Sequence, residues 1–160
     1  MLALREVRIG DAAEIARLAG ELGYPVDVDA MRARLYELSS MPQHRIVVAQ
    51  GEHGDLLGWI AAERRFTLES GERIEIVGLV VHATARGSGV GRELVADAEQ
   101  WALAQGFGAI GVRSNVVREG SHPFYESLGF VRVKTQYAYR KMLRDKACGL
   151  DLSVAGDEKV

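Results

Sequence analysis

The order of apolar and polar residues predicts helices and strands that alternate only in the middle of the chain. Ile15, Leu18, Ala19 and Leu22 recur at helical spacing behind Asp11, a residue suited to an N-cap. In the strongest expected strand, alternation places Ile74, Ile76 and Val80 on one face. Strands are expected at 3–9, 45–50, 56–66, 73–81, 109–113, 130–134 and 137–142, and helices at 11–22, 27–39, 90–104 and 121–128.

This order, β-α-α-β-β-β-α-β-α-β-β, predicts an α/β (α+β) fold. A hairpin turn at 51–55 implies antiparallel pairing, so the expected architecture is a mixed, mainly antiparallel central sheet flanked by helices. We expect a single domain over residues 1–146 and a C-terminal tail over 147–160, whose composition is that of a frayed end.

Composition narrows the function classes. The chain has 160 residues, 20 of them basic and 22 acidic, and the net charge of −2 removes the broad electrostatic argument for a nucleic-acid partner. No apolar run approaches a membrane span, and the single cysteine, Cys148, cannot form an intrachain disulfide. We therefore expect a cytoplasmic protein without a membrane or nucleic-acid partner.

Glycines crowd into residues 86–92, Arg-Gly-Ser-Gly-Val-Gly-Arg, between a buried strand and an amphipathic helix. That position brings free backbone N–H groups and the positive end of a helix dipole together, which predicts an anion site. The spacing matches neither G-x-G-x-x-G nor a P-loop, so a generic nucleotide-binding protein is not favoured.

The segment 86–91 resembles the acyl-CoA loop of the GNAT N-acetyltransferase superfamily, whose pattern is Gln/Arg-x-x-Gly-x-Gly/Ala. A second signature of that family, Phe-Tyr-x-x-Leu-Gly-Phe, matches residues 124–130 at the expected distance downstream. The resemblance implies an acetyl-CoA-dependent enzyme. It implies cofactor contacts at Leu79, Val80, Val81, Arg86, Gly87, Ser88, Gly89, Val90, Gly91 and Arg92.

One position departs from the family pattern. Many members carry an asparagine where this chain has Arg118, and Asn115 lies one helical turn earlier. We include Arg118 among the expected cofactor contacts because a guanidinium suits a CoA phosphate.

Tyr125 is the candidate general acid. The resemblance aligns it with the family's acid tyrosine, and a phenol with a pKa of about 10 can protonate a thiolate whose thiol has a pKa near 8.5. The alternative is that Tyr125 only packs beside Phe124.

Glu75 is the candidate base, because a carboxylate interrupts an apolar strand at the family's spacing before Arg86. The alternative is that Glu75 pairs with Arg73 or Arg64 across a sheet. His82 could relay a proton or simply cap the next turn. The histidines and Cys148 have no metal-ligand spacing, so we expect no metal.

The expected function is direct transfer of an acetyl group from acetyl-CoA to a primary amine, with a small molecule favoured as acceptor. The alternatives are a peptide or protein acceptor and a silent CoA-binding module. Acidic Glu21, Asp27 and Asp29 could attract a cationic amine, or the two aspartates could cap a helix. A homodimer is compatible with the resemblance.

Overall fold

The computed structural model describes residues 2–116 and 118–144. The chain divides into two compact units, Met1–Val112 and Arg113–Val160, so the single domain expected over 1–146 spans both. The expected tail over 147–160, with Cys148, lies outside the described residues.

A five-stranded sheet forms the centre of the first unit. Its strands follow the order of the sequence, and each pairs antiparallel with the one before, except that β5 pairs parallel with β4. This confirms the mixed, mainly antiparallel sheet. The strands are β1 (Ala3–Glu6), β2 (His44–Gln50), β3 (Leu56–Thr67), β4 (Gly71–Val81) and β5 (Ile110–Val112).

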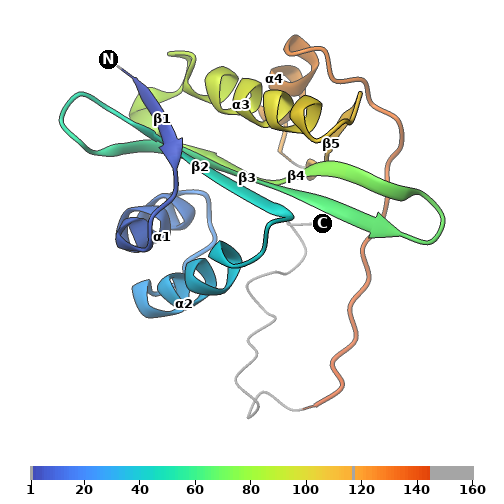
Figure 1. Ribbon diagram of the computed structural model, residues 1–160, viewed down its shortest axis with the longest axis horizontal. Coiled ribbons are helices and arrows are strands. Elements are labelled where there is room, and N and C mark those ends of the chain that lie inside the picture. Colours follow the sequence, from blue (N-terminus) through green and yellow to red (C-terminus); the bar gives the residue numbers. More distant parts are fainter. Residues whose placement is uncertain (1, 117, 145–160) are drawn as a thin grey trace. The chain divides into compact units, whose positions relative to one another are not determined.

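Helices cover both faces of this sheet (Figure 1). On one face lie α1 (Ala12–Glu21) and α2 (Val28–Ser39), and on the other lies α3 (Val90–Ala104). Two 3₁₀ turns, η1 (Ile9–Asp11) and η2 (Ala83–Ala85), precede α1 and α3. The helix that periodicity predicts over 90–104 has these same bounds in the structure.

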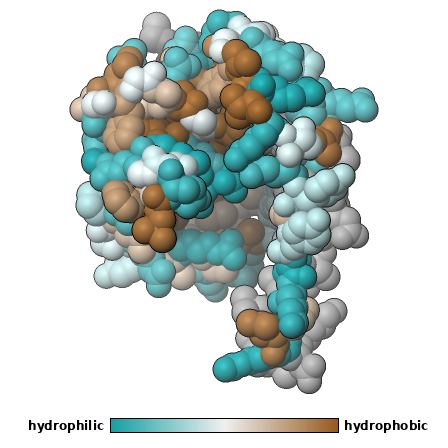
Figure 2. All heavy atoms as spheres, turned by 90° about the vertical axis from the view of Figure 1, so that its right-hand side faces the viewer, coloured by the Kyte–Doolittle hydropathy of each residue, from teal (hydrophilic) through white to brown (hydrophobic). Residues whose placement is uncertain are grey.

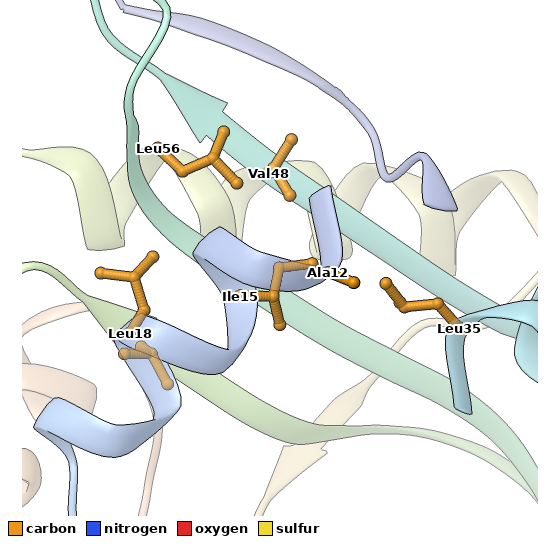
Figure 3. Packing of buried hydrophobic residues seen from close by; sticks show 7 residues of the cluster. Ala12, Ile15, Leu18, Leu35, Val48 and Leu56 are labelled. Atoms are coloured by element: carbon orange, nitrogen blue, oxygen red, sulfur yellow. The ribbon is translucent and has the colours of Figure 1, made fainter. Parts of the chain in front are cut away.

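The apolar stripe of α1 packs on the sheet, as its spacing predicts. Leu18 of α1 and Val48 of β2 are inaccessible to solvent, and on the opposite face so is Leu94 of α3. The side chains on the α1–α2 face converge between helix and strand (Figure 3). That cluster contains Ala12, Ile15, Leu18, Leu35, Val48, Leu56 and Val80.

A β-bulge corrects one expectation about β4. Ala61 lies opposite Gly78 and Ala62 opposite Ile76, so Val77 is an extra residue in β4. One extra residue moves every later side chain to the other face. Val80 therefore packs in the α1–α2 cluster, and the expectation that it shares a face with Ile74 and Ile76 is wrong.

In the second unit, α4 (Ser121–Ser127) confirms the short helix expected over 121–128, and it ends before Gly129, whose φ is +94°. The strands predicted at 130–134 and 137–142 are wrong, because the structure assigns no strand to 130–144. Alternation is a local property, whereas a strand also needs a ladder partner. Val131 and Tyr139 are instead 81% and 91% exposed.

Apolar side chains also reach the surface at the turn between β3 and β4, where Phe66 and Leu68 are exposed. Figure 2, which looks onto this end of the hairpin, shows apolar side chains set among polar ones. Within the described residues, no helix combines the length and apolar character needed to span a bilayer.

Candidate active site

The glycine loop begins where β4 ends and has the backbone conformation that only glycine adopts readily. Gly87 and Gly89 have φ angles of +81° and +94°, in the left-handed region. A Cβ at either position would meet no atom within 4 Å, so conformation and not space requires glycine in the free protein. Gly91, by contrast, is buried in the first turn of α3.

Backbone donors converge at the start of α3. The first helical hydrogen bond runs from the N–H of Glu93 to the carbonyl of Gly89, at 3.0 Å. The N–H groups of Val90, Gly91 and Arg92 therefore have no acceptor within the helix. Together with the positive end of the helix dipole, they form a site suited to a phosphate or pyrophosphate.

Cationic side chains and open space surround these donors. Arg86 is exposed, and its Nε donates to the carbonyl of Val81 at 3.3 Å. A hollow of about 420 Å³ adjoins the loop, with Arg92 on its wall. The lining consists of Leu2, Leu4, Ser88, Gly89, Arg92 and Glu93.

The strand that leads into the loop has a backbone edge free of strand pairing. On its β5 side, β4 pairs only through Ile74, Glu75 and Ile76. Residues 78–81 pair with β3 alone among the strands of the first unit. Backbone amide and carbonyl groups alternate between the two edges of a strand, and those of Val80 face β3. The groups of Leu79 and Val81 lie on the other edge and can receive an extended ligand with amide groups of its own.

Glu75 is buried between two arginines, with its side chain only 7% exposed. Arg65 Nη1 donates to Glu75 Oε2 at 3.0 Å across the β3–β4 pair, and Arg73 Nε lies 3.6 Å from the same oxygen. These contacts are those of the ion-pair alternative, with Arg65 in place of Arg64 as the cross-strand partner. The role of base stays a prediction.

His82 caps the 3₁₀ turn η2 before the loop, which is the capping alternative expected for this residue. Its Nδ1 accepts a hydrogen bond from the backbone N–H of Thr84 at 3.1 Å. Within the described residues, no group of three His, Cys, Asp or Glu side chains is placed to hold a metal ion.

In the second unit, Tyr125 lies in α4 among aromatic neighbours. Its ring makes edge contacts with Phe124 and Phe130, at centroid distances of 5.2 and 5.6 Å. Burial raises the pKa of Tyr125 above its ordinary value of 10.0, and the charge of Arg118 opposes this shift. The backbone N–H of Arg118 donates to the carbonyl of Asn115 at 3.0 Å.

The acidic residues around the connection between α1 and α2 make three different contacts. Asp27 caps α2 by accepting from the N–H of Ala30 at 2.9 Å, and Asp29 pairs with Arg32. The contact of Asp27 is the helix cap that the alternative describes, whereas Asp29 forms an ion pair on the surface of α2. Glu21, the last residue of α1, instead faces His82.

The structure thus brings the expected contacts 79–81 and 86–92 into one continuous stretch of the first unit, and it places Glu75 on the same strand. Tyr125 and Arg118 belong to the second unit. Sequence reasoning missed Arg65 and the approach of Glu21 to His82. The first could be found from the hairpin register, in which Arg65 lies opposite Arg73 and Glu63 opposite Glu75.

Comparison with known proteins confirms the family that the sequence motifs resemble. The model of the acetyltransferase (GNAT) family matches residues 12–130. An uncharacterized N-acetyltransferase of Bacillus subtilis is 28% identical over 130 residues, which cover 81% of this chain and 89% of that protein. An aminoglycoside N(6′)-acetyltransferase type 1 of Serratia marcescens is 25% identical over 116 residues, which cover 70% and 80%.

A solved structure shares the fold. AAC(6′)-Iy, in complex with the bisubstrate analogue CoA-S-monomethyl-acetylneamine, superposes with a TM-score of 0.79. The match covers 89% of this chain and 99% of that chain at 20% identity. At this identity the likeness concerns the arrangement of helices and strands.

Proposed function

We propose that this chain, which belongs to the GNAT acetyltransferase family, transfers an acetyl group from acetyl-CoA directly to the primary amine of a small molecule. The chain is an acyl-CoA-dependent N-acetyltransferase. The glycine loop is the observation that carries the choice of donor. Two glycines at positive φ, free N–H groups at a helix start and two flanking arginines fit the pyrophosphate of CoA.

The pantetheine arm of the donor has two amides, and they suit the unpaired edge of β4 at residues 78–81. When bound, acetyl-CoA supplies a thioester whose acetyl carbon is attacked by the amine nitrogen and whose C–S bond then breaks. We assign to Tyr125 the transfer of a proton to the departing sulfur. A phenol with the ordinary pKa of about 10 already keeps its proton at neutral pH. Burial raises the pKa of Tyr125 above this value.

The acceptor amine must lose a proton, since an amine with a pKa of about 10.4 is mostly charged at neutral pH. Glu75 is a poor recipient because two arginines already contact the same carboxylate oxygen. His82 is also poor, because its Nδ1 accepts from a backbone N–H. We therefore infer that the proton leaves through water, and that Glu75 holds Arg65 and Arg73.

A small-molecule acceptor is supported by the relative that acts on aminoglycosides, and a peptide amine is the alternative. A panel of aminoglycosides, polyamines, amino acids and peptides, with release of free CoA as the readout, separates the two. We expect turnover with a small amine. Binding of acetyl-CoA without thiol release from any amine would instead support the silent CoA-binding module.

The donor site is tested by Gly89→Glu, which places a side chain and a negative charge among the anion-binding N–H groups. The matched control is Gly54→Glu, at an exposed hairpin glycine whose φ of +84° imposes a similar backbone strain. Acetyl-CoA at about 100 times its Kd should stabilise the wild type and the control by about 2.7 kcal/mol in thermal denaturation. Gly89→Glu should lose this stabilisation. An unchanged wild-type melting temperature in excess acetyl-CoA would refute the proposal.

A further inference from the structure

A histidine joins the end of α1 to the start of the glycine loop. His82 follows directly after β4, and its ring approaches a polar group at each nitrogen. Nδ1 accepts from the N–H of Thr84 at 3.1 Å, and Nε2 lies 3.4 Å from Oε1 of Glu21. Glu21 is in turn 3.3 Å from Nη1 of Arg17, one turn earlier in α1.

These contacts determine the tautomer of the neutral ring. A backbone N–H can only donate, so Nδ1 presents its lone pair to the N–H of Thr84. The Thr84 hydroxyl, 2.8 Å from the same nitrogen, can act as a second donor to it. The ring proton is then on Nε2, the nitrogen that faces the carboxylate of Glu21. The ring is therefore held from two sides, with only a quarter of its side chain exposed.

The capped turn leads without interruption into the donor site. The N–H of Ala85 donates to the carbonyl of His82 at 2.9 Å, and the carbonyl of Ala85 accepts from both the N–H and the hydroxyl of Ser88. Ser88 lies between the two glycines at positive φ. Two successive hydrogen-bonded turns thus connect His82 to Ser88. A movement of His82 would therefore change the orientation of the N–H groups of the loop.

We propose that His82 is a positioning residue for the glycine loop, and that Glu21 holds its ring in place. The proposal rests on the proposed function, because it treats residues 86–92 as the acetyl-CoA site. It assigns His82 to donor affinity and not to proton transfer. Loss of the ring should weaken binding of acetyl-CoA and leave the chemical step at saturation unchanged.

Two substitutions of His82 separate the cap from the rest of the ring. His82→Ala removes the contacts of both ring nitrogens. We expect the Kd of acetyl-CoA from titration calorimetry to rise about fivefold, which corresponds to about 1 kcal/mol, the stability that a lost helix cap typically costs. His82→Asn keeps a side-chain oxygen that can accept from the N–H two residues ahead, so its Kd should be within about twofold of the wild type. The kcat of both should change by less than about twofold.

The matched control is His53→Ala, at an exposed histidine in the turn between β2 and β3, and it should bind as the wild type does. Glu21→Gln keeps an acceptor for Nε2–H and should also bind normally, whereas Glu21→Ala should raise the Kd about two- to threefold by releasing the ring. Nitrogen chemical shifts of His82 should report the Nε2–H tautomer in the wild type.

The outcomes are separable from those of the proposed function. If the wild type does not bind acetyl-CoA, the proposed function fails. If the wild type binds and His82→Ala binds equally well, or if His82→Asn is as weak as His82→Ala, the positioning role is refuted. A large fall in kcat for both His82 variants with unchanged Kd would make His82 a proton carrier and also refute it. Should His82→Ala not fold, the two Glu21 variants decide the question: if Glu21→Ala binds acetyl-CoA as tightly as Glu21→Gln, the positioning role is refuted.

Discussion

At Gly58 of β3, the neighbouring strand and the start of α3 both approach closely, and a methyl group there should affect both stability and donor binding. A Cβ at Gly58 would lie 2.7 Å from the carbonyl oxygen of Val80, 3.2 Å from Cδ1 of Leu94 and 3.3 Å from Cγ1 of Val90. The nearest of these atoms is backbone, so no side-chain rotation relieves the contact. Either β4 or the start of α3 must move.

Gly58→Ala should lower the free energy of unfolding by about 1–3 kcal/mol, the usual cost of overpacking a core. For a chain of this size, that corresponds to a fall in Tm of about 2–12 °C. Val80 and Val90 flank the glycine loop in sequence, so we also expect the Kd of acetyl-CoA to rise by about three- to tenfold. Thermal denaturation of the free protein and titration calorimetry measure the two effects independently.

Gly20→Ala is the control, because we expect it to raise the free energy of unfolding instead of lowering it. Gly20 is exposed in α1 and has no atom within 4 Å of an added Cβ, so alanine should stabilise the helix by about 0.5–1 kcal/mol. Donor affinity should stay at the wild-type value. A Tm for Gly58→Ala within about 1 °C of the wild-type Tm would count as unchanged. In that case the close approach of α3 to β3 is not real and the reasoning fails.

Three further predictions concern single side chains. Tyr125→Phe should lower kcat by about 10²–10⁴ with little change in the Kd of acetyl-CoA, and an unchanged kcat would leave Tyr125 as a packing residue. Glu75→Gln should lower the free energy of unfolding by about 1–3 kcal/mol, because the carboxylate of Glu75 neutralises Arg65. Its kcat should fall by less than about tenfold. A loss of kcat comparable to that of Tyr125→Phe would identify Glu75 as the base. Arg5 donates two hydrogen bonds to Asp11, at 2.8 and 2.9 Å, and lowers the pKa of that carboxyl. This stabilisation is present above the unfolded pKa of about 3.9 and is lost as the pH falls through the lower folded value, so Asp11→Asn should cost about 1.5–3 kcal/mol at pH 7 and progressively less below about pH 4 in urea titrations.

The parts of the fold that the sequence predicts are those in which local pattern and burial agree. Helix α3 is one example, since its apolar period and its preceding glycines are both local signals. The hairpin of β2 and β3 is another, because the turn at 51–55 fixes the pairing of its flanking strands. The sequence pattern could not reveal the extra residue at Val77, because a bulge depends on the strand that lies opposite.

In the segment 130–144 the local sequence pattern also fails to determine strand pairing, here by predicting strands that do not form. Its alternating valines and tyrosines have high strand propensity, but propensity describes how a residue fits a sheet that already exists. In the candidate site, the glycine loop could be predicted because φ and helix start are encoded locally. The ion pairs of Glu75 could also be predicted, since Arg73 lies two residues away on the same strand and the hairpin register brings Arg65 close. The contact of Glu21 with His82 could not, because it joins a helix and a loop whose spacing only the tertiary structure sets.

The position of the loop in the chain couples donor binding to the stability of the core. Val80 and Val90, at its two ends, are 2% and 3% exposed and belong to opposite faces of the sheet, while residues 86–89 between them are exposed. A ligand that fixes the exposed residues therefore reduces the freedom of two buried anchors at once. Linkage requires the converse: a substitution that loosens either anchor must weaken donor binding by the same free energy by which the donor restores that anchor. Val90→Ala alters an anchor directly, so it should lose more donor affinity than Ile15→Ala, a core substitution in α1 that reaches Val80 only through the cluster they share.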